Sequence, residues 1–428
     1  MFNVSICNQF CSIKTCLRCY FGTKDDSKLV EKVIDKFNSI LLETCVLKKG
    51  YHQNRENSYS GLPNFGSWLF TLRLLSSVVI LRFLIMISMN ETSYIHVILG
   101  NQFYLASASY IFHAILLAFC MLGLISREYC LIMEARGNLQ FLSQIFIIKD
   151  HGFDESRLNL SSYQAYIFKK RTQFCLLFWL YFIYPLCYFF VPMIIFVHLS
   201  NPNIWSDPVY LVSSAIWCTT EIFTVIHLNT SLSAVVCTIL ILIWLCVGRM
   251  KTVMERLTLM TCDQVDQIGM QLAQTNCFFI HFLNDFRSLV FNVKYYVLYN
   301  FLIIAAASDF AIFFGFIIKI HSPLTSNLLA FTGFLAIAVG SLIIYACSAF
   351  WCQFNLFCGI YSAFLARSKA KLNTNQGLKI LHILEMCSYN GIKMGDLCTM
   401  RSTLLVYFLL ENAAAIMLLV VNLRSLDA

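Results

Sequence analysis

The sequence predicts an all-α polytopic membrane protein, that is, one whose helices cross a lipid bilayer several times. Of its 428 residues, 58% are hydrophobic and 13% are charged, whereas soluble proteins average about 45–50% apolar and about 25% charged residues. The apolar residues form runs of about 20, the length of a helix that spans a hydrocarbon core roughly 30 Å thick. This composition excludes a soluble globular enzyme, a disordered protein and a small secreted module held together by disulfides.

Seven segments have the length and hydropathy of transmembrane helices. Lipid offers no hydrogen-bond partner to the backbone, so a spanning segment must be a helix or part of a closed barrel, and the alternating pattern of a barrel strand is not seen. The predicted spans are Trp68–Met89, Phe103–Ile125, Phe174–His198, Thr224–Val247, Tyr295–Ile318, Ser326–Phe350 and Ser402–Leu423.

The fourth span lies within an unusually long apolar stretch. From Val209 to Val247 the only charged residue is Glu221, and there is neither Gly nor Pro. One unbroken helix of that length would measure about 58 Å, more than the hydrocarbon core requires. Two spans joined by a hidden turn would also account for the length, but they would reverse the side of everything that follows.

The distribution of Lys and Arg decides between these alternatives, because basic loops stay in the cytoplasm. With a cytoplasmic N-terminus and seven spans, 27 basic residues lie inside and two outside. Splitting the fourth span would move the five basic residues of 248–294 to the outside. We therefore predict a cytoplasmic N-terminus, an extracellular C-terminus and one long fourth helix that extends outward through residues 209–223. No secretory signal peptide precedes the first span.

This topology divides the chain into four parts. Residues 1–67 form a cytoplasmic segment, and 68–350 form a six-helix region with inner extensions at 126–173 and 248–294. Residues 351–401 precede the last span, and 402–428 comprise the seventh helix with a short extracellular tail.

Two inner stretches have the apolar periodicity of amphipathic helices. The first predicts that the fifth span continues about 40 Å into the cytosol, and the second lies before the seventh span. We expect such stripes to be buried in a cytosolic helical bundle, within a subunit or between subunits; the alternative is that the helices lie on the inner leaflet. The stripes are Val265, Ile268, Leu272, Phe279, Phe282, Leu283, Phe286, Leu289, Val290 and Val293, and Leu378, Leu381, Ile383 and Leu384.

Other local signals concern proline, glycosylation, cysteine and catalysis. Pro185 and Pro192 are expected to kink the third span near its outer end, and Asn90 begins a glycosylation sequon on the first outer loop. The spacing of the N-terminal cysteines predicts reduced or lipid-modified thiols, with a metal site as the alternative. These cysteines are Cys7, Cys11, Cys16 and Cys19.

Catalytic and phosphate-binding motifs are absent from the sequence, so we predict neither an enzyme nor a cofactor.

Four charged residues lie at membrane depth, where each costs roughly 2.5–3.5 kcal/mol at a helix centre and therefore usually serves a function or has a partner. Asp309 lies in the outer half of the fifth span, Glu221 at the outer end of the fourth and Glu411 midway along the seventh. Arg82, in the outer half of the first span, is expected to reach the headgroups or to pair with an acid.

A candidate ligand site is predicted in the outer halves of spans two to six. Aromatic side chains with a few polar groups suit a small organic ligand, although the same residue types also serve at the membrane interface and between helices. The candidates are Tyr110, His113, Tyr188, Trp217, His227, Asp309 and Phe313.

Two familiar seven-span or multi-span classes fit less well. A G-protein-coupled receptor would have the opposite orientation, an outer disulfide and an Asn-Pro-x-x-Tyr motif in its last span. It would also have an Asp-Arg-Tyr triplet after its third span, whereas here Arg127-Glu128-Tyr129 follows the second span and has a different order. A secondary transporter would be expected to show paired repeats and helices broken by Gly or Pro near mid-membrane. Both stay open as alternatives.

The chain resembles the arthropod chemoreceptor superfamily, specifically a divergent member of its gustatory receptor branch. The shared features are the length, the inner N-terminus, the short outer loops, the long fourth helix and the inner helical region before the last span. The stretch from Gly391 to Leu397 also resembles that family. In the seventh span the hydrophobic run of the gustatory signature is present, with Asn422 in the place of its Gln and Leu423 in the place of its Phe.

This resemblance implies a ligand-gated, non-selective cation channel in the plasma membrane that acts as a gustatory-type receptor for a small molecule. Four subunits, identical or related, would place their seventh helices around a central pore, and the cytosolic helices would hold the tetramer together. The outer half of the other six spans would bind the ligand, and monovalent and divalent cations would pass.

The pore and gate residues implied are Asn422, Leu423 and Leu419, because a ring of apolar side chains can close a pore by dewetting and an amide ring can replace part of an ion's hydration. We add Glu411, since a ring of carboxylates would favour cations. If Glu411 faced a neighbouring helix instead, it would need a donor such as Asn412 or Arg401.

Overall fold

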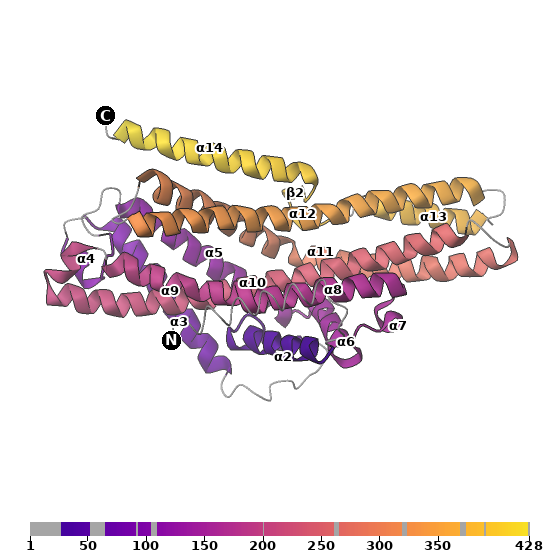
Figure 1. Cartoon of the computed structure of the whole chain (residues 1–428), viewed down its shortest axis with the longest axis horizontal. Helices are drawn as coiled ribbons and strands as arrows, with labels where there is room; N and C mark the ends of the chain where they lie inside the picture. The colour runs from indigo at the N-terminus through magenta and orange to yellow at the C-terminus, as the bar shows by residue number, and fades with distance from the viewer. Residues whose placement is uncertain are drawn as a thin grey trace.

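The computed structural model describes residues 27–51, 65–90, 93–103, 109–199, 201–260, 265–318, 323–368, 374–388 and 391–426. Within these ranges almost every residue is helical, and the long helices run roughly along one axis (Figure 1). The predicted all-α class is therefore confirmed.

Six single helices of the described chain are long and apolar enough to cross a membrane. They correspond to predicted spans one, two, four, five, six and seven, and the first of them begins within three residues of its predicted start. The chain is thus a multi-pass membrane protein. The six helices are α3 (Phe65–Ser88), α5 (Ser109–Ala135), α10 (Pro208–Met260), α11 (Val265–Ile312), α12 (Pro323–Ser368) and α14 (Ser402–Leu426).

The predicted third span is one continuous helical run with an irregular turn. It consists of α8 (Ser162–Phe178), the π-helix η2 (Trp179–Ile183) and α9 (Tyr184–Leu199). The wide turn of η2 ends just before Pro185, which has no N–H to donate and whose ring collides with a regular turn. The widened turn is one way to accommodate that residue, and Pro192 lies within α9. The run also begins twelve residues before the predicted span, because Ser161 caps its N-terminus.

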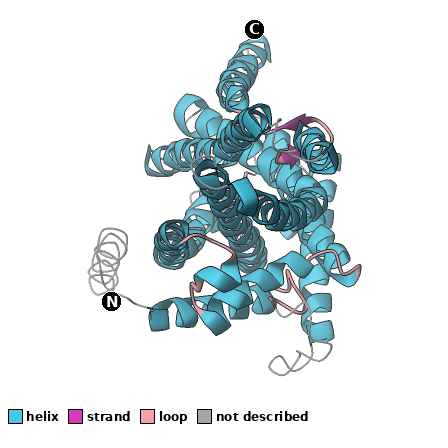
Figure 2. Ribbon diagram, turned by 90° about the vertical axis from the view of Figure 1, so that its right-hand side faces the viewer, coloured by secondary structure: helices cyan, strands magenta, loops and turns pink. Residues whose placement is uncertain are grey.

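Helix α10 confirms the prediction of one long fourth helix. It has 53 residues without a break, which corresponds to about 80 Å. It packs against α3, α5, α8, α9, α11 and α12, so it contacts most of the long helices of the bundle, which Figure 2 shows from one end.

The N-terminal segment contains a helix that the prediction of a cytoplasmic segment 1–67 did not include. Helix α2 (Ser27–Glu43) packs on α8 and α10. Its residues Ile34, Phe37 and Leu41 are buried, and the Phe37 ring lies 4.2 Å from that of Trp179. The four N-terminal cysteines lie outside the described residues.

Short helices and one hairpin connect these long elements. They are α4 (Ile95–Ile98), η1 (Gln140–Ser143), α6 (Gln144–His151), α7 (Glu155–Leu158), η3 (Pro202–Trp205), η4 (Phe313–Ile318), α13 (Thr374–Ser388), β1 (Lys393–Met394) and β2 (Cys398–Thr399). η4 is a π-helix that continues α11.

The predicted inner stripe of the fifth span is buried against α12. Phe279 stacks on Phe357 with ring centroids 4.2 Å apart, and Phe286 stacks on Phe350 at 4.4 Å. The side chains of Val265 and Ile268 lie outside the described part, but the stripe from Leu272 onward is buried. Aromatic stacking thus joins α11 to α12 at the end of the molecule that carries the predicted cytosolic loops, which we call the inner end.

The second predicted stripe is only partly correct. Helix α13 buries Ile380 and Ile383, whereas Leu378 and Leu381 are exposed. The helix packs on α12 and α11 through one narrow face. Leu384 is half-buried against the core, whereas Leu378 and Leu381 are left uncovered in a single subunit.

Candidate functional site

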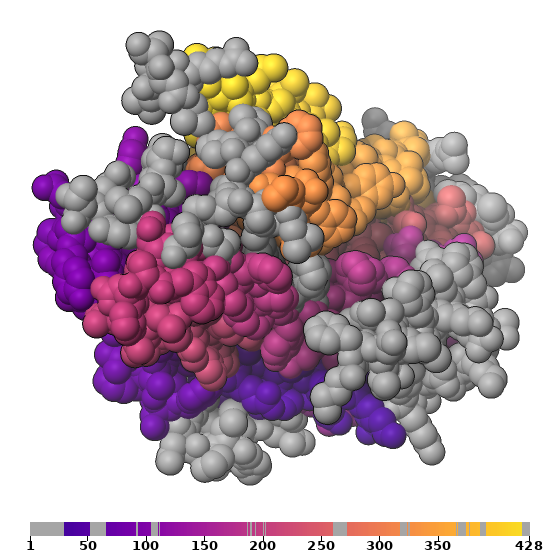
Figure 3. All heavy atoms as spheres, turned by 60° about the vertical axis from the view of Figure 1, so that its left-hand side comes forward, coloured from indigo at the N-terminus to yellow at the C-terminus, as the bar shows by residue number. Residues whose placement is uncertain are grey.

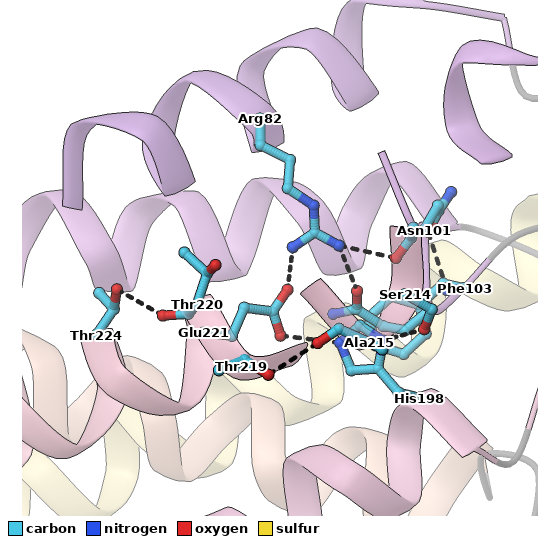
Figure 4. Close-up of polar contacts among 12 residues, drawn as sticks. Arg82, Asn101, Phe103, His198, Ser214, Ala215, Thr219, Thr220, Glu221 and Thr224 are labelled. Atoms are coloured by element: carbon cyan, nitrogen blue, oxygen red, sulfur yellow. Dashed lines mark hydrogen bonds and ion pairs between the residues drawn. The ribbon is translucent and has the colours of Figure 1, made fainter. Parts of the chain in front are cut away.

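Arg82 and Glu221, two of the four intramembrane charges, form a buried ion pair near the outer end (Figure 4). Arg82 is 1% exposed. Its Nε donates to the Leu99 carbonyl at 2.7 Å, and its Nη2 donates to the Gly100 carbonyl at 2.8 Å and to Gln102 Oε1 at 3.1 Å. All these groups come from α3, α10 and the loop before α5, so that the guanidinium joins three segments.

His198, at the end of α9, reaches the same carboxylate. Its Nε2 lies 3.3 Å from Glu221 Oε2, and its Nδ1 lies 2.8 Å from Ser214 Oγ. We call Arg82, Gln102, His198, Ser214 and Glu221 the outer polar cluster. Because every member is buried, the cluster fixes the first, third and fourth transmembrane helices to one another.

Gly100 lets the loop approach α10 closely enough to complete this cluster. Its φ is +57°, and an added Cβ would lie 2.8 Å from Ser214 Cα and 2.9 Å from the Ser213 carbonyl oxygen. Both the left-handed conformation and the contact with backbone atoms favour glycine here. The following turn places Phe103 in the loop, where its N–H donates to Asn101 Oδ1 at 2.9 Å, so the second helix starts later than the predicted Phe103.

Two predicted ligand residues border the outer polar cluster. The Arg82 guanidinium lies 4.8 Å from the ring of Trp217 and 5.3 Å from that of Phe83. The fully buried His113 ring packs 6.1 Å from the Phe83 ring. Trp217 therefore contacts Arg82, and His113 contacts Phe83.

A third predicted residue, Phe313, joins them through a chain of rings. Phe103 packs on His113 at 5.7 Å and on Phe112 at 4.4 Å. Phe112 contacts Phe314 at 3.8 Å, and Phe314 contacts Phe313 at 5.1 Å. We call Phe103, Phe112, Phe313 and Phe314 the outer aromatic cluster; it connects α5 to η4.

The contacts described for the other four predicted ligand residues do not include the outer polar cluster or the outer aromatic cluster. Tyr110 and Tyr188 are exposed, and the Tyr188 hydroxyl lies 3.0 Å from that of Tyr184 on the same helix. The His227 ring packs 5.7 Å from that of Trp68. Asp309 is half-buried, and its Oδ1 has no hydrogen-bond partner in the described part of the chain.

Several residues of this region were not among the predicted ligand residues. Gln102, His198 and Ser214 are polar side chains at helix ends, and Phe83 follows Arg82 directly. A search around each intramembrane charge would have found Phe83. The pairing of Arg82 with a residue 139 positions later has no sequence signal of its own.

Helix α14, the predicted pore helix, is attached to the bundle by a narrow face. Phe408 packs on Phe301 with centroids 5.1 Å apart, and it approaches Gly340, whose added Cβ would lie 3.0 Å from Phe408 Cζ. Asn412 accepts a hydrogen bond of 2.8 Å from Ser308 of α11. Figure 3 shows α14 as a ridge at the top of the molecule, beside α12.

Much of the remaining surface of α14 is uncovered. Glu411 is exposed, and Asn412 contacts Ser308 rather than this carboxylate, while the Arg401 guanidinium lies over the Trp351 ring at 4.7 Å. The exposed apolar residues of the helix are Val406, Tyr407, Leu409, Leu410, Met417, Leu418 and Val421.

Of the predicted gate residues, the structure describes only the side chain of Leu419. Leu419 packs against the outer aromatic cluster of its own subunit. The side chains of Asn422 and Leu423 lie outside the described part. The outer end of α14 is therefore in contact with the region around the predicted ligand residues.

The inner end of α14 begins at the β1–β2 hairpin, which α11 holds in place. The Gly395 N–H donates to the Lys294 carbonyl at 2.8 Å. Asp396 accepts hydrogen bonds of 2.5 Å from Lys294 Nζ and from the Tyr295 hydroxyl. The hydrogen bonds from Lys294 and Tyr295 lower the pKa of the Asp396 carboxyl below its ordinary value.

This pKa predicts how the hairpin contact depends on pH. A lowered folded-state pKa means that the contact contributes fully above the unfolded value of about 3.9 and is lost as pH falls through the folded value. We therefore expect Asp396→Asn to lower the unfolding temperature of the purified protein slightly around pH 7, with the difference from wild type shrinking as the pH falls below the unfolded value and through the lowered folded-state pKa. Asp150→Asn, at an exposed residue of α6, is the matched control; an equal change in both variants would contradict a specific role for Asp396.

Two further predictions concern modification and metal. Asn90 is exposed just after α3, a position open to a glycan. In the ranges that the structure describes, no three His, Cys, Asp or Glu side chains gather where they could hold a metal ion.

No protein-family model matches the sequence, and no curated protein matches it. Solved structures similar to it include the insect olfactory receptor OR5 of Machilis hrabei and the same receptor in complex with eugenol. Each has a TM-score of 0.64 and 13% sequence identity, covering 92% of this chain and 99% of the receptor chain. The chain has the insect olfactory receptor fold. Because the match spans nearly the whole chain, the olfactory receptor fold includes both the membrane helices and the inner end.

Proposed function

We propose that this chain is a subunit of a ligand-gated, non-selective cation channel that serves as a chemosensory receptor of the gustatory type in the plasma membrane. The observation that carries the proposal is the exposed face of α14 in an olfactory receptor fold. From Leu409 to Val421, the exposed residues of that face are apolar except for Glu411.

An exposed carboxylate on an apolar helix favours a pore over a lipid-facing surface. In lipid, Glu411 would cost roughly 2.5–3.5 kcal/mol near the membrane centre. If four α14 helices surrounded a central pore, the water in the pore would hydrate this carboxylate. The helices would bury their apolar residues against one another. Residues 402–428 would then form the pore, with Asn422, Leu423 and Leu419 at its outer gate.

The inner end supports assembly of four subunits. Leu378 and Leu381 of α13 are apolar and exposed, and α11, α12 and α13 pack together there. In a tetramer these leucines would be covered by a neighbouring subunit. The partner subunits would be identical or related chains, and residues 351–401 would hold them together.

The ligand is proposed to be a small organic molecule bound within residues 68–350. The similar receptor binds eugenol, a small aromatic molecule, and the outer aromatic cluster with Trp217 and His113 offers ring surfaces to such a molecule. This region also contacts Leu419 of α14, so that ligand binding there would act directly on the pore helix.

Expression of the full chain in cells tests the proposal. We expect a current evoked by small organic tastants that persists when G proteins are blocked and carries both monovalent and divalent cations. A response that G-protein blockade abolishes would favour a G-protein-coupled receptor, and substrate uptake without current would favour a transporter.

Glu411 should influence which ions pass. We expect Glu411→Gln to lower the permeability of cations relative to anions several-fold, and Glu411→Lys to lower it further, because a cationic ring repels cations. Reversal potentials in asymmetric salt measure this ratio. Glu411→Asp keeps the charge and is the control; an unchanged ratio in Glu411→Lys would place Glu411 away from the ion path.

A further inference from the structure

Three charged side chains meet between α3 and α5, in the half of each helix that is nearer the inner end. Arg73 of α3 donates to Glu128 of α5 from Nε at 3.0 Å and from Nη2 at 2.5 Å. Arg127, the residue before Glu128, donates from its Nη2 to Glu128 Oε1 at 3.2 Å. We call Arg73, Arg127 and Glu128 the inner charge cluster. Two guanidinium groups share one carboxylate, so the cluster has one positive charge in excess.

The Arg127 guanidinium lacks acceptors that a buried charge needs. The Arg127 side chain is 2% exposed, and its Nε is buried without a hydrogen-bond partner in the described part of the chain. Buried charges are normally paired and hydrogen-bonded, because an unsatisfied charged donor is costly. The carboxylate to which Arg127 donates, that of Glu128, also serves Arg73. The inner charge cluster therefore has room for one more anionic acceptor.

The inner charge cluster reaches a surface that faces lipid. The side chain of Arg73 is 48% exposed and that of Glu128 is 26% exposed. Both residues lie in apolar stripes of helices that are long and apolar enough to span a membrane. Charges in such a surface are costly unless they have a partner or reach the headgroups. The exposed apolar neighbours are Phe70 and Leu74 on α3 and Ile125 and Ile132 on α5.

The phosphate of a phospholipid has the chemistry that this cluster lacks. It is negatively charged, and its oxygens accept hydrogen bonds from the fork of a guanidinium, while acyl chains would contact the exposed apolar neighbours. Phosphatidylcholine also brings a cationic group, which leaves the excess charge of the cluster uncompensated. Basic sites between transmembrane helices on the cytoplasmic side bind anionic headgroups in other membrane proteins. We propose that the inner charge cluster binds an anionic phospholipid of the inner leaflet, with its phosphate on Arg73 in front of the Arg127 guanidinium.

Thermal unfolding of the purified full chain in neutral detergent tests the site. We expect phosphatidylglycerol at about ten times its Kd to raise the unfolding temperature of the wild type by about 2 °C more than phosphatidylcholine at the same mole fraction. Arg73→Gln should weaken the binding of phosphatidylglycerol about tenfold, because a charge-assisted hydrogen bond is lost. The extra rise with phosphatidylglycerol should then fall to about a third.

Arg136→Gln is the matched control for the loss of one positive charge. Arg136 is exposed directly after the end of α5, so this variant should respond to phosphatidylglycerol as the wild type does. An equal reduction in Arg136→Gln and Arg73→Gln would mean that the lipid is attracted to the basic inner surface in general. That result, or equal rises of the wild type with the two lipids, would overturn the proposal.

Glu128→Gln gives a test of opposite sign. This variant leaves both arginines without their carboxylate, so its unfolding temperature in neutral detergent should be lower than that of the wild type. Its extra rise with phosphatidylglycerol should exceed that of the wild type, because the lipid phosphate replaces the lost negative charge. A rise no larger than that of the wild type would contradict binding at this cluster.

A soluble phosphate ester distinguishes a lipid site from a site for free phosphate. We expect sn-glycerol 3-phosphate, at the same concentration as the lipid, to cause no rise that depends on Arg73, because it has no acyl chains. A rise that equals that with phosphatidylglycerol and is reduced in Arg73→Gln would show that the assignment to lipid is wrong. Protein stability is the measured quantity throughout, so these results do not depend on whether the chain forms a channel.

Discussion

Arg82→Ala should lower the free energy of unfolding by about 3–5 kcal/mol, the usual cost of removing one partner from a buried ion pair. The substitution leaves the Glu221 carboxylate in a buried site with His198 as its remaining contact. It also removes the donors to the Leu99 and Gly100 carbonyls. We expect a large loss of monodisperse protein on size-exclusion chromatography of detergent extracts and a lower unfolding temperature of the remainder.

Two further variants distinguish the destabilisation caused by an unpaired buried charge from that caused by the loss of a long side chain. Arg73, on the same helix, forms an exposed pair with Glu128 at 2.5 Å, and such pairs contribute about 0–1 kcal/mol. Arg73→Ala is therefore expected to be nearly neutral. Replacing Arg82 and Glu221 together by Met removes both charges, so this double variant should be more stable than Arg82→Ala. If the double variant were less stable than Arg82→Ala, the unpaired charge of Glu221 would not be the reason why Arg82→Ala is destabilised.

The stability of the outer polar cluster bears on the proposed ligand region. Trp217 contacts Arg82, and His113 contacts the adjacent Phe83. A rigid cluster therefore positions two of the candidate ligand residues from α5 and α10. Ligand sensitivity is expected to change with substitutions at Trp217 or His113 more than at the exposed Tyr110 or Tyr188.

The helices could be predicted from sequence because lipid imposes their length and hydropathy. The charge distribution correctly predicted a single fourth helix, observed as Pro208–Met260. Its inner extension beyond Val247 contains Arg249, Lys251 and Arg256, so hydropathy ends the span before the helix ends. Helix α2 was missed because charged residues alternate with its apolar ones, although Ile34, Phe37 and Leu41 have helical spacing.

The candidate site was less predictable, because depth along a span does not define a helix face. Tyr110 and Tyr188 lie at the predicted depth, but the structure exposes both. The contacts of His113 and Phe313 run through Phe103, a loop residue that hydropathy had assigned to the second span. Its position depends on the left-handed Gly100 and on the backbone of α10, which are tertiary features.

One added methyl group at the junction between α11 and α12 should also lower the free energy of unfolding strongly, as Arg82→Ala does. An added Cβ at Gly333 would lie 2.7 Å from Ile312 Cγ1 and 2.9 Å from both Ile312 N and the Ser308 carbonyl oxygen. Gly315 makes the reciprocal approach, since its Cβ would lie 2.3 Å from Ala330 N. Backbone atoms cannot rotate away as a side chain can, so relief requires the two helices to separate.

We therefore expect Gly333→Ala to destabilise the protein by about 3 kcal/mol, at the upper end of the usual cost of overpacking. Gly359, on the same helix, has no atom within 4 Å of an added Cβ, so Gly359→Ala should be neutral or stabilising by up to about 1 kcal/mol through helix propensity. Thermal unfolding of the two purified variants compares their stabilities directly.

Because Ser308 also donates to Asn412 of α14, separation of the helices at Gly333 should disturb the pore helix as well. The currents of Gly333→Ala should therefore differ from those of the wild type even at matched surface expression. Equal stability of the two alanine variants would mean that α11 and α12 are not in backbone contact at this junction.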